Sequence, residues 1–364
     1  MHWYAARPVI ASITMMSAMA HKISILKIVI IFGLIVGMHE GAHFLVAKKL
    51  HIYVREFSIG FGPKLFSKMK NGTTYSLRAI PFGGFNDLAD DPNSERPETD
   101  IKDENTKYFR NARIRERFAI VIAGATINII FAIVLFFSIN LFYENKSLIV
   151  DKVGKEYKAY GILFPGDEIL KINGKKLHVS SDLDNYFFIH QVDEVTLTII
   201  RDGKEMNLEV PVSTTQGNGY TRYLLGIAPT IVEKTIKNQC YHSFWGTVNF
   251  VKKTFFGYAM LITGNMPLES VSGPVGIGET IVSSKGIYEF LYYMSAISLS
   301  LGIVNLLPIP GLDGGKVVFL IIEFIRKKKI NEDVEMMLTI AGMIFLLLIA
   351  FIVTNKDIMS HFIE

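Results

Sequence analysis

Cysteine is nearly absent from the sequence, since Cys240 is the only one among 364 residues. A single cysteine excludes an internal disulfide framework, and it excludes the zinc sites that are built from cysteine pairs. Any metal site in the chain is therefore expected to use histidine and carboxylate ligands. Stripes of Lys and Arg interleaved with aromatic residues are also missing, and the net charge is a modest +4, so nucleic acid is not an expected partner.

Apolar residues, in contrast, make up half of the chain, and the mean hydropathy of +0.31 is high for a soluble protein. A helix needs about 20 apolar residues to cross the hydrocarbon layer of a membrane, and four segments meet this length. They are residues 23–47, 118–142, 288–307 and 334–354. The expected fold is a polytopic α-helical membrane protein with four transmembrane helices.

Positive charge predicts how these helices are oriented. Lys and Arg are frequent in residues 48–117 and in residues 326–329, and loops rich in these residues stay in the cytoplasm. Both termini and residues 144–286 are then expected outside the cytoplasm. Residues 1–22, ahead of the first span, are interpreted as a leader-like extension, with a disordered or interfacial tail as the alternative.

The outer segment contains a predicted β-rich domain, residues 148–232, in which short strands alternate with turns such as Asn173-Gly174 and Asp202-Gly203. The run from Phe164 to Gly174 places a Pro-Gly-Asp turn before a strand and an Asn-Gly turn after it, and it resembles the signature of PDZ domains. The resemblance implies that this domain binds extended peptide tails by strand addition. An unrelated small β-barrel is the alternative.

The rest of the chain is interpreted as a membrane core in two halves, residues 23–143 and 287–364. Between the β-rich domain and the second half lie residues 233–286, where aromatic residues are mixed with Lys252 and Lys253. This mixture is typical of an interfacial amphipathic helix.

The strongest chemical signal is His39-Glu40-Gly41-Ala42-His43, inside the first apolar segment. An α-helix turns about 100° per residue, so His39 and His43 lie on one face and can bind one zinc ion. Glu40 is turned away from the ion yet lies close enough to take a proton from a water molecule bound to it. Three ionisable residues in a membrane span are costly and indicate a functional site. The alternative is that neighbouring helices merely satisfy them.

A catalytic zinc ion usually has three protein ligands and one open position. The soluble metzincin pattern would require Gly at position 46 and His at position 49, where this chain has Val46 and Lys49. Asp313 is the best candidate for the third ligand, because prolines break the helix just before it and free a turn that can line a cavity. The alternative role of Asp313 is an N-cap for a helix over residues 316–325, and both roles are compatible.

These residues occur with further motifs in an order and spacing that resemble the site-2 protease family, in its bacterial RseP/RasP branch with one PDZ domain. The resemblance extends from residue 23 to residue 362. The further motifs are Glu56-Phe-Ser-Ile-Gly-Phe-Gly62, Ile80-Pro-Phe-Gly-Gly-Phe85, Ala123-Gly124-x-x-x-Asn128, Ser272-Gly-Pro-Val-Gly-Ile277 and Asn305 with Leu312-Asp313-Gly314. Two positions depart from the family, since Ala42 stands where Gly is usual and Ala125 where Pro is frequent. Neither departure removes a ligand.

For the metal centre, the resemblance implies Zn²⁺ held by His39, His43 and Asp313, with Glu40 as general base and then general acid. For the substrate, it implies that Asn305 is a polar partner near the substrate or the oxyanion.

The resemblance also implies a membrane-associated β-hairpin over Thr73 to Phe85, with Gly83 and Gly84, that pairs with an unwound substrate. An ordinary tight turn in a solvent loop is the alternative for the two glycines. Asn128 is a further candidate for substrate binding, and a simple interhelical hydrogen-bond donor is its alternative role.

The expected function is an intramembrane zinc metalloprotease in the lipid bilayer of a bacterial cell membrane. Its substrates would be single-span membrane proteins, such as anti-sigma factors or remnant signal peptides. The runner-up is a proteolytically silent scaffold whose PDZ-like domain captures peptides and whose histidines only bind metal. Glu40 argues against the scaffold, which has no chemical use for it. A zinc transporter would need further His or Asp ligands along several spans, and the other apolar segments lack them.

Overall fold

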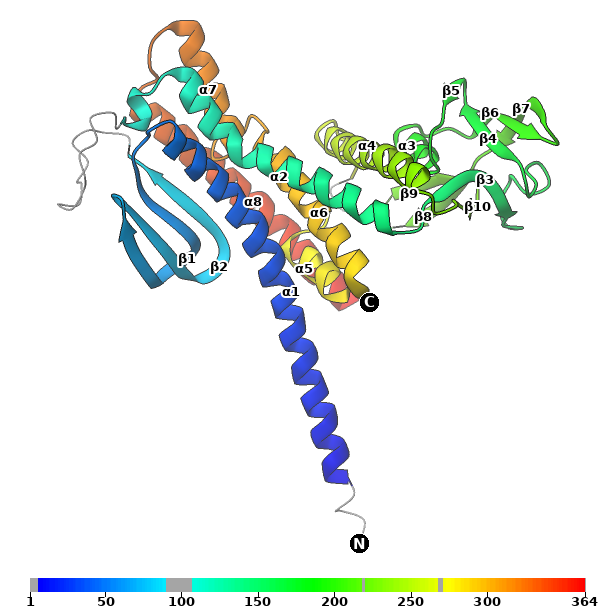
Figure 1. The fold of residues 1–364 in the computed structure, drawn as a ribbon, viewed down its shortest axis with the longest axis horizontal. Coiled ribbons are helices and arrows are strands. Elements are labelled where there is room, and N and C mark those ends of the chain that lie inside the picture. Colours follow the sequence, from blue (N-terminus) through cyan, green and yellow to red (C-terminus); the bar gives the residue numbers. More distant parts are fainter. Residues whose placement is uncertain (1–5, 90–106, 218–219, 268–270, 364) are drawn as a thin grey trace. The chain divides into compact units, whose positions relative to one another are not determined.

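The structure is a computed structural model that describes residues 6–89, 107–217, 220–267 and 271–363, and Figure 1 shows its ribbon. The chain divides into two compact units, one of residues 1–132 with 273–364 and the other of residues 133–272. Each unit has its own cluster of buried apolar side chains.

Helices dominate the first unit, and α2 continues from it into the second. The helices are α1 (Ala6–Lys49), η1 (Phe109–Asn111), α2 (Ile114–Phe142), α5 (Pro274–Ser283), α6 (Gly286–Asn305), α7 (Asp313–Arg326) and α8 (Glu332–Ile363). Among the described residues, four stretches are long and apolar enough to cross a membrane: Ser24–Lys49, Ile114–Phe142, Gly286–Asn305 and Glu332–Met359. The four predicted spans are confirmed as helices of this kind. Helix α1 runs without a break from Ala6 into the first span. The leader-like role of residues 1–22 stays a prediction.

Charged side chains from two spans cap the short helix α5, which begins in the Ser272–Ile277 motif. At its start, Asp357 Oδ2 accepts a hydrogen bond of 2.9 Å from the backbone N–H of Gly276. At its end, Lys27 Nζ donates a hydrogen bond of 2.9 Å to Ser284 O. An anion at the first turn and a cation at the last turn both complement the helix dipole. The caps thereby join α5 to α1 and α8.

A hairpin of two long strands, β1 (Val54–Lys70) and β2 (Thr73–Leu88), packs beside α1. Asn71-Gly72 forms its turn with φ values of +50° and +70°, as a type I′ turn requires. The structure corrects the predicted bounds of this hairpin: Thr73–Phe85 is part of a single strand, and its partner strand precedes it in the sequence.

Glu56 of β1 lies at the centre of a polar cluster in this hairpin. Its carboxylate accepts hydrogen bonds from Ser76 Oγ at 2.5 Å, from Arg78 Nη2 at 2.8 Å and from Lys64 Nζ at 3.0 Å. Burial raises the pKa of Glu56, but the hydrogen bonds from Ser76, Arg78 and Lys64 outweigh it and lower the pKa to about 2. The carboxylate therefore stays ionised at neutral pH and holds the curled strands together.

The second unit contains a β-rich region, as predicted. Its elements are β3 (Lys146–Val153), β4 (Glu168–Ile172), β5 (Lys175–Lys176), α3 (Ser181–Ile189), β6 (Glu194–Arg201), β7 (Lys204–Pro211), β8 (Ser213–Gly217), β9 (Tyr220–Leu224), β10 (Ile227–Ile231) and α4 (Ile236–Ile262). The main sheet has the strand order β10-β3-β4-β6-β7, with β5 beside β4, and β8 pairs with β9. Fourteen buried apolar residues, among them Ile169, Leu197 and Ile199, form its core.

The PDZ-like signature has a clear structural role in this sheet. Gly166 makes the turn at φ +94°, a conformation that favours glycine. Arg201 donates two hydrogen bonds to Asp167, Nε to Oδ1 at 2.8 Å and Nη2 to Oδ2 at 2.7 Å. Burial raises the pKa of Asp167, but the bonds from Arg201 prevail and lower it. Asn173-Gly174, at φ +45° and +77°, closes the β4–β5 hairpin as predicted.

Helix α4 is amphipathic in the reverse of the usual sense. Its buried residues are polar: Gln239, Ser243, Thr247 and Asn249. Its exposed face carries large apolar side chains: Ile236, Tyr241, Phe244, Phe255, Phe256 and Ile262. The polar face packs on α3, where Asn185 Nδ2 donates to Asn249 O at 2.9 Å. Near the end of α2, the rings of Phe136 and Phe250 stack with centroids 4.1 Å apart.

Candidate metal centre

Two histidines of α1 and one aspartate of α7 meet in the first unit. His39 Nε2 lies 3.2 Å from His43 Nε2, and each of the two nitrogens lies 3.3 Å from Asp313 Oδ2. Both histidines are buried. In the part of the chain that the structure describes, these residues form the one cluster with ligand atoms close enough to share a metal ion. The structure thus brings together the three predicted ligands.

The spacing of these atoms fits zinc. In a tetrahedral site with bonds of about 2.0–2.1 Å, neighbouring ligand atoms lie about 3.3 Å apart. Asp313 Oδ2 is also buried without a hydrogen-bond partner among the described residues, which is costly unless the atom binds something else. Three donors of this kind leave one tetrahedral position open, as in catalytic zinc sites.

Hydrogen bonds orient both imidazoles for this task. His43 Nδ1 lies 2.7 Å from Ile120 O, which can only accept, so Nδ1 carries a proton and the neutral ring has its lone pair on Nε2. His39 Nδ1 lies 3.3 Å from the amide of Asn128. Rotation of this amide by 180° turns Oδ1, which has no partner among the described residues, toward a protonated Nδ1. Both rings then present Nε2 to the centre.

Gly124 of α2 makes room for the two rings. A Cβ atom at this position would lie 2.3 Å from His43 Nε2 and 2.7 Å from His39 Cε1. Both distances are far below van der Waals contact, so any side chain at this position would displace the imidazoles. The Ala-Gly motif in the second span therefore has a steric function at the centre.

Glu40 is held from the side by β2. Asn86 Nδ2 donates hydrogen bonds to Glu40 Oε2 at 2.7 Å and to Glu40 O at 2.9 Å. Gly84 lets the strand pass close to the same side chain, since a Cβ at that position would lie 3.1 Å from Glu40 Cγ. The strand thus contacts the residue next to the metal centre.

The turn before α7 places Asp313 at the centre. Leu312 is the N-cap of α7, and Asp313 is the first residue of the helix with its carboxylate directed at the histidines. The alternative role of Asp313 as an N-cap is therefore wrong. The next residue, Gly314, permits the tight turn, because a Cβ there would lie 2.1 Å from Leu307 O.

A buried ion pair connects α7 to α2. Arg117 Nη2 donates to Glu323 Oε1 at 2.5 Å, and both side chains are about nine-tenths buried. A buried charge without its partner is strongly destabilising, so the pair holds the two helices in one arrangement. Since α2 carries Gly124 and α7 carries Asp313, this arrangement also determines the geometry of the metal centre.

The remaining predicted site residues lie on three different elements, β2, α2 and α6. Gly83 and Gly84 lie within β2, so the alternative of a tight turn in a solvent loop is wrong. Asn128 is fully buried, and its contact with His39 is that of an interhelical hydrogen-bond partner. Asn305 is the last residue of α6, and its role beside the substrate stays a prediction.

Sequence reasoning missed three features of this centre: Asn86, the steric role of Gly124 and the pair of Arg117 with Glu323. The sequence shows Gly124 as part of a motif, but it does not show that the rings of His39 and His43 lie beside it. Asn86 directly follows the Ile80–Phe85 motif, and only its polar nature in a β-strand could have drawn attention to it.

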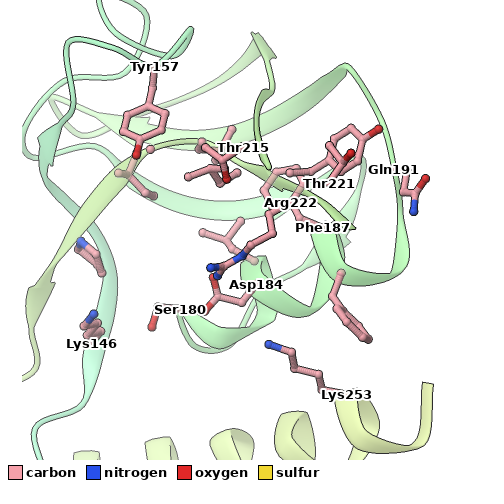
Figure 2. Close-up of a pocket in the computed structure, with 18 of the residues that line it drawn as sticks. Lys146, Tyr157, Ser180, Asp184, Phe187, Gln191, Thr215, Thr221, Arg222 and Lys253 are labelled. Atoms are coloured by element: carbon pink, nitrogen blue, oxygen red, sulfur yellow. The ribbon is translucent and has the colours of Figure 1, made fainter. Parts of the chain in front are cut away.

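The second unit has a groove of its own, with a cavity volume of about 480 Å³. Figure 2 shows Arg222 and Asp184 pointing toward each other inside it, with Lys253 of α4 extending toward them. Helix α3 forms one wall, and β9 and the chain that follows it form another. The groove combines apolar side chains such as Phe187 with charged ones such as Arg222.

A membrane-spanning helical chain with a His-His-Asp centre and an adjacent glutamate has the architecture of a metallopeptidase. Comparison with known protein families agrees: residues 27–349 match the model of peptidase family M50, and the chain belongs to this family. The match includes every residue of the metal centre.

Curated relatives cover nearly the whole chain. A candidate zinc metalloprotease of Fusobacterium nucleatum is 33% identical over 350 residues, which are 92% of this chain and 98% of the relative. The zinc metalloprotease RasP of Geobacillus kaustophilus is 29% identical over 93% of this chain and 99% of its own. The regulator of sigma-W protease RasP of Bacillus subtilis is also 29% identical, over 93% and 99%.

Among solved structures, the PDZ domain of an SdrC-like protein from Listeria innocua matches 24% of this chain and 99% of its own length. Its sequence identity is 22% and its TM-score is 0.22.

Proposed function

We propose that this chain is an intramembrane zinc metalloprotease of the site-2 type. It hydrolyses peptide bonds in or near the transmembrane segments of single-span membrane proteins. The observation that carries the proposal is the convergence of His39, His43 and Asp313 at 3.2–3.3 Å. The two histidines and Glu40 lie on a helix that can span a membrane. The names of the M50 relatives, zinc metalloproteases including RasP, support the same activity.

The roles of the residues follow from their geometry. His39, His43 and Asp313 hold Zn²⁺, which when bound lowers the pKa of water and polarises a carbonyl group. Glu40 accepts the proton of the attacking water and then delivers it to the leaving amine. The proton thus leaves the nucleophile and ends on the new amino terminus, and no further acid is required.

Strand β2 is the proposed docking edge for the substrate. A peptide bond inside a helix is shielded by neighbouring turns, so the substrate must be extended before hydrolysis. Pairing with a strand edge replaces the backbone hydrogen bonds that unwinding removes. The strand passes Glu40 at Gly84, which supports docking there, and Asn305 completes the proposed substrate contacts.

A bacterial cell membrane is the proposed location, with the metal centre near its cytoplasmic side. The Lys- and Arg-rich segments 48–117 and 326–329 support this orientation. The hairpin is proposed to contact lipid, because it exposes apolar side chains: Phe61, Leu65, Phe66, Met69, Leu77 and Ile80. The exposed aromatic face of α4 supports an interfacial position on the outer side.

The PDZ-like region is proposed to bind peptide tails in the groove beside α3 and to admit only substrates that have been shortened outside the membrane. Three cations, Lys146, Arg222 and Lys253, line the groove against one acidic residue, Asp184. A positive balance of this kind favours a free carboxylate. Anti-sigma factors and remnant signal peptides fit this substrate class, and the name of the Bacillus subtilis relative points to sigma-factor regulation.

Glu40→Gln tests the activity. Cleavage of a membrane-anchored test substrate by the purified protein is expected to fall by a factor of about 10²–10⁴, the usual contribution of a general base. Zinc content is expected to stay at the wild-type level, because Glu40 is not a ligand. Equal cleavage by the variant and the wild type would rule out the mechanism.

Replacing residues 148–232 with a short linker tests whether the PDZ-like region admits only shortened substrates. The junctions lie close together, since Val232 N donates to Asn145 O at 2.8 Å beside the β3–β10 pair. We expect faster cleavage of substrates with intact outer domains and unchanged cleavage of pre-shortened ones. Loss of all cleavage by a variant that still binds zinc would contradict this selective role of the PDZ-like region.

A further inference from the structure

Asn86 connects the proposed docking strand directly to Glu40. It lies on β2, 46 positions along the chain from Glu40, and its amide nitrogen donates to both the carboxylate and the backbone carbonyl of that residue. We propose that Asn86 is a positioning residue that sets the orientation of Glu40 and couples it to the position of β2. This inference rests on the proposed proteolytic function and names a residue to which neither the family motifs nor the predicted site assigns a role.

The orientation of the amide is unambiguous. Both groups that face it, Glu40 Oε2 and Glu40 O, are oxygen atoms that only accept when the carboxylate is ionised. Nδ2 must therefore point at Glu40, and Oδ1 must point away. One donor group thus contacts both the backbone carbonyl and the carboxylate of Glu40, and the bond of 2.7 Å to the carboxylate is of the strong, charge-assisted kind. The side chain loses rotamer freedom that would otherwise let it swing away from the centre.

Packing fixes the position of Asn86 independently of these bonds. Residues two apart in a strand share one face, so Gly84 and Asn86 both face α1. Asn86 lies opposite Phe57 of β1 in the strand register, and the Phe57 ring packs on Phe44 of α1 at a centroid distance of 5.0 Å. The strand is thus anchored on the helix that carries Glu40, and movement of the strand would carry Asn86 with it.

The surroundings of Asn86 make it suitable for substitution. It lines a cavity of about 420 Å³ in the first unit, whose wall also includes Val121, Phe319 and Leu320. Removing the amide therefore enlarges an existing cavity and opens no gap in a packed core. The neighbouring Asp87 offers a matched control, because it lines the same cavity but its carboxylate is bonded to Arg55 at 2.9 Å, on the hairpin, and not to Glu40.

The experiment compares the full-length wild type with Asn86→Ala, Asn86→Asp and Asp87→Asn on a membrane-anchored test substrate, with zinc content and thermal stability measured in parallel. Asn86→Ala is expected to lower kcat by about 10–100-fold, the usual effect of a residue that orients a functional group, while KM changes by less than about twofold. Asn86→Asp keeps the shape but places a carboxylate against that of Glu40, so its loss of kcat is expected to be at least as large. Zinc content and thermal stability are expected to match the wild type, and Asp87→Asn is expected to keep wild-type kcat.

Several results would overturn the assignment. A wild-type kcat in both Asn86 variants would show that Glu40 needs no positioning, and a loss of zinc in proportion to activity would show a structural role. A change confined to KM would show a role in binding alone. If instead the zinc-loaded wild type leaves the substrate intact, the proposed function fails, and the assignment fails with it.

Discussion

Gly124→Ala is expected to abolish both zinc binding and cleavage, although glycine to alanine ordinarily stabilises a helix. The added methyl group would lie 2.3 Å from His43 Nε2, in the space that the two imidazoles occupy. Neither ring can move away without losing its partner, Ile120 O for His43 and the Asn128 amide for His39. The zinc content of the purified variant, determined beside its activity, checks this prediction.

Gly37→Ala is the matched control, because it lies on the helix that carries both histidines and a Cβ there meets nothing within 4 Å. It is expected to keep its zinc and its activity. A Gly124→Ala variant with full zinc content would show that the two imidazoles do not occupy the space beside Gly124, and it would remove the steric role of this residue.

Asp313→Ala is expected to leave two imidazoles that bind zinc weakly. The carboxylate supplies the third donor atom and the only negative charge of the proposed ligand set. We therefore expect the affinity for zinc to fall by more than about 100-fold, which exceeds the usual effect of losing a residue that only hydrogen-bonds to a ligand. Titration of the metal-free protein with Zn²⁺ measures this change, and cleavage should disappear with it.

Asp333→Asn, in the exposed first turn of α8, serves as the control and should bind zinc like the wild type. Wild-type zinc affinity in Asp313→Ala would mean that another residue completes the centre, and the proposed ligand set would have to be abandoned.

Local features of the site were predictable because they depend on regular spacing. His39 and His43 share a helix face by the geometry of the helix alone, and the apolar segments around them follow from length and composition. The turns at Asn173-Gly174 and Asp202-Gly203 were predictable for the same reason, since their positive φ values suit those residue types.

Contacts between segments far apart in the sequence were harder to predict. Asp313 was proposed as a ligand from helix-breaking prolines and from a family resemblance, while its distance of 3.3 Å to each imidazole required coordinates. The hairpin was expected over Thr73–Phe85, but strand pairing depends on the partner, and the partner strand was β1. The local feature that indicates β1 as the partner is the Asn71-Gly72 turn, and that turn lies just before the residues over which the hairpin was expected.

By itself, the sequence determined the four apolar helices, the face of α1 that carries the histidines and the chemistry that histidine, glutamate and aspartate can perform. Only the tertiary structure decided that Gly124 borders the imidazoles, that Asn86 holds Glu40 and that Arg117 pairs with Glu323. The physical reason is that helix periodicity and residue chemistry are local properties, whereas these three contacts depend on how separate elements pack against one another.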